Sequence, residues 1–160
     1  MATQSGSDNR ESIIESYFAA FNAIQKGDER AVDRMMDLWH ESGHCQVVGA
    51  GKLPDEYRGL NAVRALYKGI ARAPRQEIHT ERGRTRATKE DVVVEWTSQI
   101  GIDPKPLKVD GSNAFSFKDN RISDLKIVLS PKGATGQQLK LHELEVSDIG
   151  RLALAAWAVV

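Results

Sequence analysis

This sequence of 160 residues is poor in cysteine, in net charge and in long apolar runs, and each lack excludes a class of function. It has one cysteine, Cys45, so an intramolecular disulfide is impossible and nothing points to an oxidising compartment. Its 22 basic and 22 acidic residues balance, which removes the electrostatic signature of proteins that bind nucleic acids or acidic membranes. The longest apolar run, residues 152–160, is about half of the ~20 residues that cross a bilayer. We therefore expect no nucleic acid and no membrane as a partner, which favours a neutral small molecule.

The N-terminal residues are small and polar, and they lack the basic-then-apolar order of a secretion signal. Together with the lone cysteine, this predicts a soluble, cytoplasmic protein. A chain of this length makes one ordinary domain with a single core. Cys45 itself is expected to be a small buried residue that opens a strand.

Two amphipathic helices are predicted at the start of the chain. Asp8 and Glu11 have the spacing of an N-cap and its capping-box partner, and Gly27 closes the first helix. Asp28 then caps the second helix. Both helices carry apolar residues at spacings of three and four, which place them on one face: Ile14, Tyr17, Phe18, Phe21 and Ile24 in the first, and Val32, Met35, Met36 and Trp39 in the second.

A strand and a third helix follow. Residues 44–50 form the expected strand, and Pro54 argues against a helix in the loop 52–58. The third helix begins at Gly59 and stops before Pro74. Its predicted buried face comprises Val63, Leu66, Tyr67 and Ile70.

Four segments then alternate as strands do, and we expect them to form one antiparallel meander: residues 76–88, 92–102, 107–117 and 122–129, the last two joined by a turn at 118–121. This order of elements predicts an α+β fold, a cone-shaped curled antiparallel sheet wrapped by three helices. Such a cone leaves an interior cavity, the usual place for a ligand or for chemistry.

The C-terminal part is expected to extend this fold. We assign residues 1–131 to the cone domain and residues 132–160 to a linker followed by a helix that Ser147 caps. That helix is too apolar to stay exposed. We therefore expect it to pack on the same domain or on the mate in a homodimer.

The segment His40-Glu41-Ser42-Gly43-His44 matches the H-E-x-x-H pattern of zinc hydrolases, in which two imidazoles share one face of a helix and the glutamate acts as general base. Its context disagrees with that function. Gly43 is a poor residue for a helix interior, and residues 45–48 switch to strand propensity. With His44 on a strand the two imidazoles lose their one-turn spacing, so we expect no metal and no cofactor.

A second motif, Arg82, Arg84 and Arg86, repeats at every second residue and would project from one face of a strand. The simplest interpretation is a solvated or dimer-facing surface. A site for an anionic ligand or a nucleic acid is the alternative, and nucleic-acid binding would weaken steeply with salt.

Two polar side chains are predicted to lie on apolar faces. Tyr17 belongs to the apolar stripe of the first helix, so its hydroxyl must find a partner or face a cavity. Asn113 shares a strand face with Val109, Phe115 and Phe117. A buried amide without partners is costly, so Asn113 is either a satisfied core group or a donor in a pocket.

The segment Tyr17-Phe18-Ala19-Ala20-Phe21-Asn22-Ala23, followed by Gly27-Asp28 and by Arg58-Gly59 at the start of a helix, resembles the nuclear-transport-factor-two-like superfamily. Within it, the SnoaL-like polyketide cyclases and ketosteroid isomerases are most similar, over about residues 10 to 130. In the isomerases a tyrosine on the first helix and a protonated aspartic acid on a late strand donate to a substrate oxyanion. The resemblance puts Tyr17 and Asn113 at these two positions.

An amide can donate a hydrogen bond at any pH, so the change from acid to Asn113 is compatible with the oxyanion role. The base of the isomerases, in contrast, falls at about Val48, and valine cannot move a proton. His44, His79 or Glu95 could supply a base from elsewhere, and no spacing singles one of them out. The grouping of arginine and aspartate found in the epoxide hydrolases of the family is not evident in this sequence.

The resemblance implies a small-molecule enzyme of the isomerase or cyclase type, in which Tyr17 and Asn113 stabilise the enolate-like oxyanion of an apolar carbonyl-bearing substrate. The walls of the cavity are expected to include Phe21, Trp39, Val48, Tyr67, Trp96 and Phe115. The alternative is a non-catalytic ligand-binding or dimerisation domain with the same fold, which the valine at position 48 favours.

Overall fold

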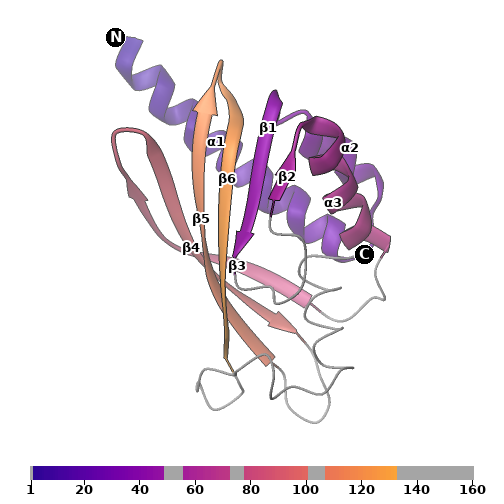
Figure 1. The fold of residues 1–160 in the computed structure, drawn as a ribbon. Helices are drawn as coiled ribbons and strands as arrows, with labels where there is room; N and C mark the ends of the chain where they lie inside the picture. Colours follow the sequence, from indigo (N-terminus) through magenta and orange to yellow (C-terminus); the bar gives the residue numbers. More distant parts are fainter. Residues whose placement is uncertain (1, 49–55, 73–77, 101–106, 133–160) are drawn as a thin grey trace.

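The computed structural model describes residues 2–48, 56–72, 78–100 and 107–132 (Figure 1). Apart from Lys132, which ends β6, the predicted linker and C-terminal helix lie outside these ranges, so the predictions about them and about the homodimer stay predictions. Within the described part of the chain, no helix is long and apolar enough to cross a membrane. The elements in chain order are α1 (Ala2–Gln25), α2 (Arg30–Met36), β1 (Trp39–Val48), β2 (Glu56–Arg58), α3 (Leu60–Arg72), β3 (Ile78–Ala87), β4 (Asp91–Ile100), β5 (Leu107–Lys118) and β6 (Arg121–Lys132).

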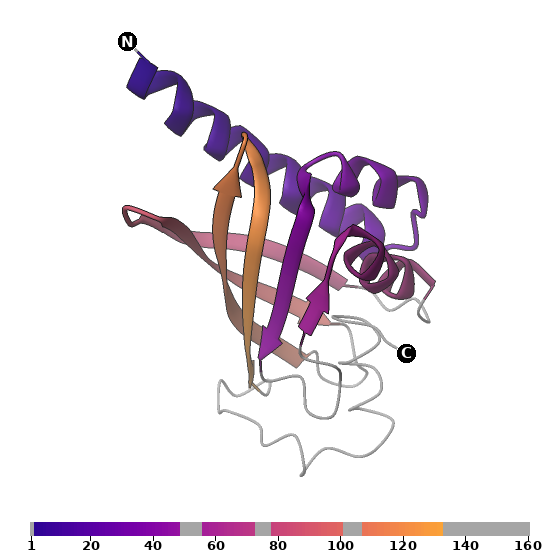
Figure 2. The ribbon, with the colours of Figure 1, turned by 45° about the horizontal axis from the view of Figure 1, so that its top comes forward.

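The strands form one six-stranded sheet in the order β2-β1-β6-β5-β4-β3. Figure 2 shows its strong twist, with β3 and β4 crossing the direction of β1 and β6. The sheet curls without closing, because β2 and β3 remain its two edges. The helix α1 crosses behind the sheet, and α2 and α3 lie at its β1–β2 side (Figures 1 and 2).

The predicted antiparallel meander is confirmed for β3, β4, β5 and β6. The whole sheet is nevertheless mixed, because β1 pairs with β6 in parallel. Alternation along a segment shows that it is a strand, but it does not reveal a partner 80 or more residues away, as Cys45 and Leu125 are. The turn between β5 and β6 was also predicted, and Asp119 and Asn120 both adopt the positive φ values of 52° and 59° that tight hairpin turns need.

The core lies between the helices and the inner face of the sheet. The predicted apolar faces of α1 and α3 are confirmed, since every residue that was predicted on these two faces is buried. The sheet contributes buried residues from β1, β4, β5 and β6: Trp39, Cys45, Val47, Val92, Val94, Trp96, Val109, Phe115, Ile122, Leu125 and Ile127.

The end of α1 follows the prediction and its start does not. Gly27 has a φ of 93°, its N–H donates to the carbonyl of Ile24, and the N–H of Asp28 donates to the carbonyl of Ala23. These two bonds are the Schellman motif that ends many helices at a glycine. The helix begins at Ala2, however, so Asp8 lies inside it and the predicted capping box is wrong.

Two boundaries in the next segment also differ from the prediction. The helix α2 ends at Met36, and Trp39 opens β1 five residues before the expected strand. The spacing from Met36 to Trp39 fits a helix, but Trp39 pairs with Ile122 of β6, and this long-range pairing prevails. The expected loop 52–58 contains the three-residue strand β2, whose Tyr57 pairs with Cys45.

The packing of α1 against the edge strand β3 depends on Asn22. Its Oδ1 accepts the backbone N–H of Thr80 at 2.9 Å, and its Nδ2 donates to the carbonyl of Thr80 at 3.0 Å. Gln25 Nε2 donates to the Thr80 hydroxyl at 3.0 Å, and this hydroxyl also bonds Ser98 on β4. The amide of Asn22 thus fills the place of a neighbouring strand at the open edge.

Candidate functional site

Four polar groups meet inside the apolar core. The hydroxyl oxygens of Tyr17 on α1 and Tyr67 on α3 are 2.9 Å apart. Asn113 on β5 hydrogen-bonds Tyr17, and its Oδ1 accepts the Nε1 proton of Trp96 on β4 at 2.8 Å. All four side chains are buried. The structure therefore brings Tyr17 and Asn113 together, as the sequence suggested, and adds Tyr67 and Trp96 to the same chain of hydrogen bonds.

The direction of these bonds follows from the chemistry of the groups. The indole of Trp96 can only donate, so the carbonyl oxygen of Asn113 faces Trp96 and its NH₂ group faces Tyr17. Burial raises the pKa of the Tyr17 hydroxyl, as does the nearby Cys45, whereas the bonds to Tyr67 and Asn113 oppose the rise. The NH₂ group of Asn113 thus donates to Tyr17, whereas either tyrosine hydroxyl can be the donor in the bond between Tyr17 and Tyr67. That bond uses one of the two hydroxyl protons, so the other is left to serve a ligand.

Aromatic rings surround this chain of hydrogen bonds. The Tyr17 ring stacks on Phe21 with centroids 6.0 Å apart, and it meets the edge of Phe115 at 5.1 Å. The Tyr67 ring lies 6.3 Å from the ring of Trp39. The cluster, which we define as Tyr17, Phe21, Trp39, Tyr67, Trp96, Asn113 and Phe115, contains every predicted site residue except one.

The exception is Val48, which was expected in the wall of the cavity. It is 39% exposed and lies on the outer face of the sheet, so this prediction is wrong. Buried and exposed residues alternate along β1, and the inward positions are Cys45 and Val47. A shift of one residue in the expected register reverses the face, which explains the error.

Cys45 on β1 is a buried residue that acts on the two tyrosines of the cluster. It raises the pKa of both Tyr17 and Tyr67, and burial raises its own pKa, so its thiol stays protonated. Nothing in the sequence predicted its position near the two tyrosines. Tyr67, however, lies on the apolar face of a helix just as Tyr17 does, so the same argument could have identified its hydroxyl.

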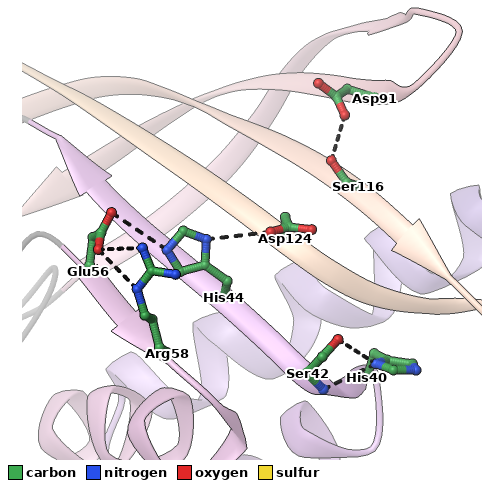
Figure 3. A network of polar contacts seen from close by, with 8 residues as sticks. All are labelled: His40, Ser42, His44, Glu56, Arg58, Asp91, Ser116 and Asp124. Carbon is green, nitrogen blue, oxygen red and sulfur yellow. Dashed lines mark hydrogen bonds and ion pairs between the residues drawn. The ribbon is translucent and has the colours of Figure 1, made fainter.

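The three suggested bases do not reach Tyr17. His44 lies on the outer face of β1, with Nδ1 3.4 Å from Asp124 Oδ1 and Nε2 3.8 Å from Glu56 Oε1 (Figure 3). His79 and Glu95 are both exposed. Among the described residues, the hydrogen-bond partners found for the Tyr17 hydroxyl are Tyr67 and Asn113, and neither is a carboxylate or an imidazole.

The two histidines of the H-E-x-x-H segment take part in separate contacts. His40 Nδ1 is 2.7 Å from the hydroxyl of Ser42, whereas His44 lies between the carboxylates of Glu56 and Asp124 (Figure 3). Both residues belong to β1; His44 was predicted on a strand, whereas His40 was expected at the end of a helix. In the part of the chain that the structure describes, no group of three or more His, Cys, Asp or Glu side chains is arranged to hold a metal ion.

The three arginines of β3 do not share one face, which corrects the prediction. The pairing of β3 with β4 shifts by one residue between Arg82 and Thr85. Arg82 pairs with the buried Trp96, faces α1, and forms an ion pair of 2.7 Å with Glu11. Arg86 lies beyond the irregularity and pairs with Val93, whose side chain is on the opposite face from that of Trp96. The predicted row of parallel positive charges is therefore interrupted.

Comparison with known proteins adds to this geometry. The family model described as the SnoaL-like domain matches residues 14–125. No curated protein matches the sequence.

Solved structures resemble this fold at low identity. One is SalBIII, an epoxide hydrolase/cyclase-like enzyme with a role in pyran ring formation in the polyether salinomycin. It is 21% identical with a TM-score of 0.58, over 81% of this chain and 95% of that one. An NTF2-like protein of unknown function from Burkholderia pseudomallei is 12% identical with a TM-score of 0.61, over 74% and 88%. A candidate polyketide cyclase from Sinorhizobium meliloti is 16% identical with a TM-score of 0.54, over 72% and 93%. At these identities the likeness establishes the fold.

Proposed function

Because the chain belongs to the SnoaL-like domain family, we propose that it is a small-molecule pocket protein that binds an apolar carbonyl compound and polarises its oxygen, as an isomerase or cyclase does. The observation that carries this proposal is the buried pair of hydroxyls of Tyr17 and Tyr67, 2.9 Å apart, with Asn113 bonded to Tyr17. The bond between the hydroxyls uses one of their two protons, so the other can be donated to a third oxygen, as the stabilisation of an oxyanion requires.

The surroundings support this role for Tyr17. Burial raises the pKa of its hydroxyl, so it remains a neutral donor at physiological pH. The rings of Phe21 and Phe115 provide an apolar environment, in which a hydrogen bond to a developing negative charge is stronger than in water. Three of the solved structures with this fold are named as a cyclase, a cyclase-like enzyme or an isomerase, which agrees with this proposal.

The proposal is tested by the binding of 1-tetralone, an apolar bicyclic ketone, followed through tryptophan fluorescence. We expect Tyr17→Phe to weaken binding by about ten- to a hundredfold, since a lost hydrogen bond to a buried carbonyl is worth about 1–3 kcal/mol. The matched control is Tyr57→Phe, which removes a half-buried hydroxyl on β2 outside the cluster. Equal affinities of the wild type and Tyr17→Phe would contradict the proposal.

A non-catalytic binding domain is the second candidate, and one observation favours it. Among the described residues, neither of the two partners found for Tyr17 is a side chain that could remove a proton from carbon at neutral pH. Exchange of the α-protons of bound 1-tetralone in D₂O, followed by proton NMR, separates the candidates. Exchange that the wild type accelerates and Tyr17→Phe does not indicates an enzyme of the isomerase type, whereas binding without exchange indicates a carrier or sensor.

A further inference from the structure

One polar atom of the cluster has no partner among the described residues. The Nε1 of Trp39 is buried, since the residue is only 1% exposed, and it forms no hydrogen bond within the described part of the chain. More than nine in ten buried polar groups in proteins are paired, so an unpaired indole N–H needs an explanation. An oxygen atom of a ligand that accepts this proton would satisfy it.

The position of Trp39 connects it to the proposed carbonyl site. It is the first residue of β1, and its ring is tilted by 57° against the ring of Tyr67, whose hydroxyl lies 2.9 Å from that of Tyr17. A Cβ atom on Gly43 would lie 2.8 Å from Trp39 Cε3, so this edge of the indole rests on the strand. The Nε1 atom belongs to the opposite edge of the indole and is therefore directed away from Gly43.

We propose that Trp39 determines ligand specificity by donating its Nε1 proton to a second oxygen of the ligand bound at Tyr17. This inference rests on the proposed function and extends it to a substrate class, apolar carbonyl compounds with a further oxygen acceptor across the ring system from the carbonyl. Two donors from different elements, Tyr17 on α1 and Trp39 on β1, then fix the ligand at both ends. A site built to donate at two points discriminates against ligands that leave one donor unpaired.

The test compares 1-tetralone with its 5-, 6- and 7-methoxy derivatives, which place an ether oxygen at different positions on the same skeleton. We expect at least one derivative to bind the wild type about fivefold or more tightly than 1-tetralone does. In Trp39→Phe this advantage is expected to vanish, because the ring remains and the N–H is lost. Any loss of packing in that variant affects all four ligands alike, so the ratio of affinities isolates the hydrogen bond.

A direct measurement on the wild type covers the case in which Trp39→Phe does not fold. The indole N–H signal of Trp39 in a ¹H–¹⁵N NMR spectrum is expected to move downfield with the favoured derivative and to move less with 1-tetralone. The signal is assigned by elimination with Trp96→Phe and Trp157→Phe.

The inference is overturned if no methoxy derivative binds more tightly than 1-tetralone, if the advantage persists in Trp39→Phe, or if the Trp39 signal does not move. Its failure is distinguishable from that of the proposed function. If 1-tetralone binds and Tyr17→Phe weakens it while Trp39 has no effect on the ratio, only the role of Trp39 is lost. If Tyr17→Phe changes nothing, the proposed function itself is wrong.

Discussion

Gly111 shows how tightly the residues around the hydrogen-bonded chain are packed. A Cβ atom at this position would overlap the six-membered ring of Trp96 and the carbonyl oxygen of Val128. Trp96 needs this space to bring its Nε1 to Asn113, which in turn bonds Tyr17. The lack of a side chain at Gly111 on β5 therefore helps to position Tyr17, the proposed donor.

We expect Gly111→Ala to lower the free energy of unfolding by about 1–3 kcal/mol, because a methyl group inserted into a packed core displaces its neighbours. It should also change the fluorescence of Trp96 in the folded state. Urea unfolding provides the first value and an emission spectrum the second.

The matched control is Gly83→Ala on β3, where the nearest atom to an added Cβ is 3.4 Å away, an ordinary contact. Its expected change is within about 0.5 kcal/mol. Equal effects of the two substitutions would show that the packing at Gly111 is not special.

Individual site residues could be predicted to the extent that each lies on a recognisable face. Tyr17 and Asn113 were identified because each is polar on an apolar face. The contacts of Asn113 with Trp96 and of Tyr17 with Tyr67 could not be predicted, because they join elements that are 17 and 50 residues apart. The unpaired N–H of Trp39 was also beyond prediction, since a missing partner is visible only when all the neighbours are known.

At the scale of elements, the contact between α1 and β3 depends on one amide. Asn22 pairs with both backbone groups of Thr80 and so occupies the open edge of the sheet. In the sequence Asn22 was noted only as part of the family pattern. In the structure it joins α1 to β3. The same helix carries Tyr17, so this contact helps to hold the proposed donor in place.

We expect Asn22→Ala to lower the free energy of unfolding by about 1–3 kcal/mol, because it leaves a part-buried backbone N–H and C=O of Thr80 without their partners. Hydrogen exchange of the Thr80 amide should become faster. Asn61→Ala is the matched control, since Asn61 is exposed on α3, and its expected change is within about 0.5 kcal/mol. Unchanged protection of Thr80 in Asn22→Ala would contradict this role.

At the scale of the whole molecule, the core holds several acidic groups in their neutral forms. Burial raises the pKa of Tyr17, Tyr67 and Cys45 above their ordinary values of 10.0 for tyrosine and 9.0 for cysteine. In the unfolded chain these groups ionise at their ordinary pKa values. Above those values the unfolded state binds fewer protons than the folded state, so stability falls as the pH rises.

We therefore expect these three groups to leave the free energy of unfolding unchanged below about pH 8. From about pH 9 to pH 11 they should make it decline. Each group contributes up to about 1.4 kcal/mol per pH unit once its unfolded form is ionised. In Cys45→Ala the decline should begin about one pH unit later, because only the tyrosines remain. Urea unfolding measured at several pH values provides the profile, and identical profiles for the wild type and Cys45→Ala would refute the burial of a neutral thiol.

The sequence by itself determined the three helices and five of the six strands, apart from some of their ends, as well as which faces of α1 and α3 are buried and which polar residues lie on apolar faces. These properties follow from local periodicity, which depends on neighbours three or four residues apart in a helix and two apart in a strand. Only the tertiary structure decided that β1 pairs with β6 in parallel, that Val48 points outward, and that Tyr67 and Trp96 hydrogen-bond Tyr17 and Asn113. The reason is that the pairing of distant strands sets their register, and a register shift of one residue moves a side chain from the interior to the surface.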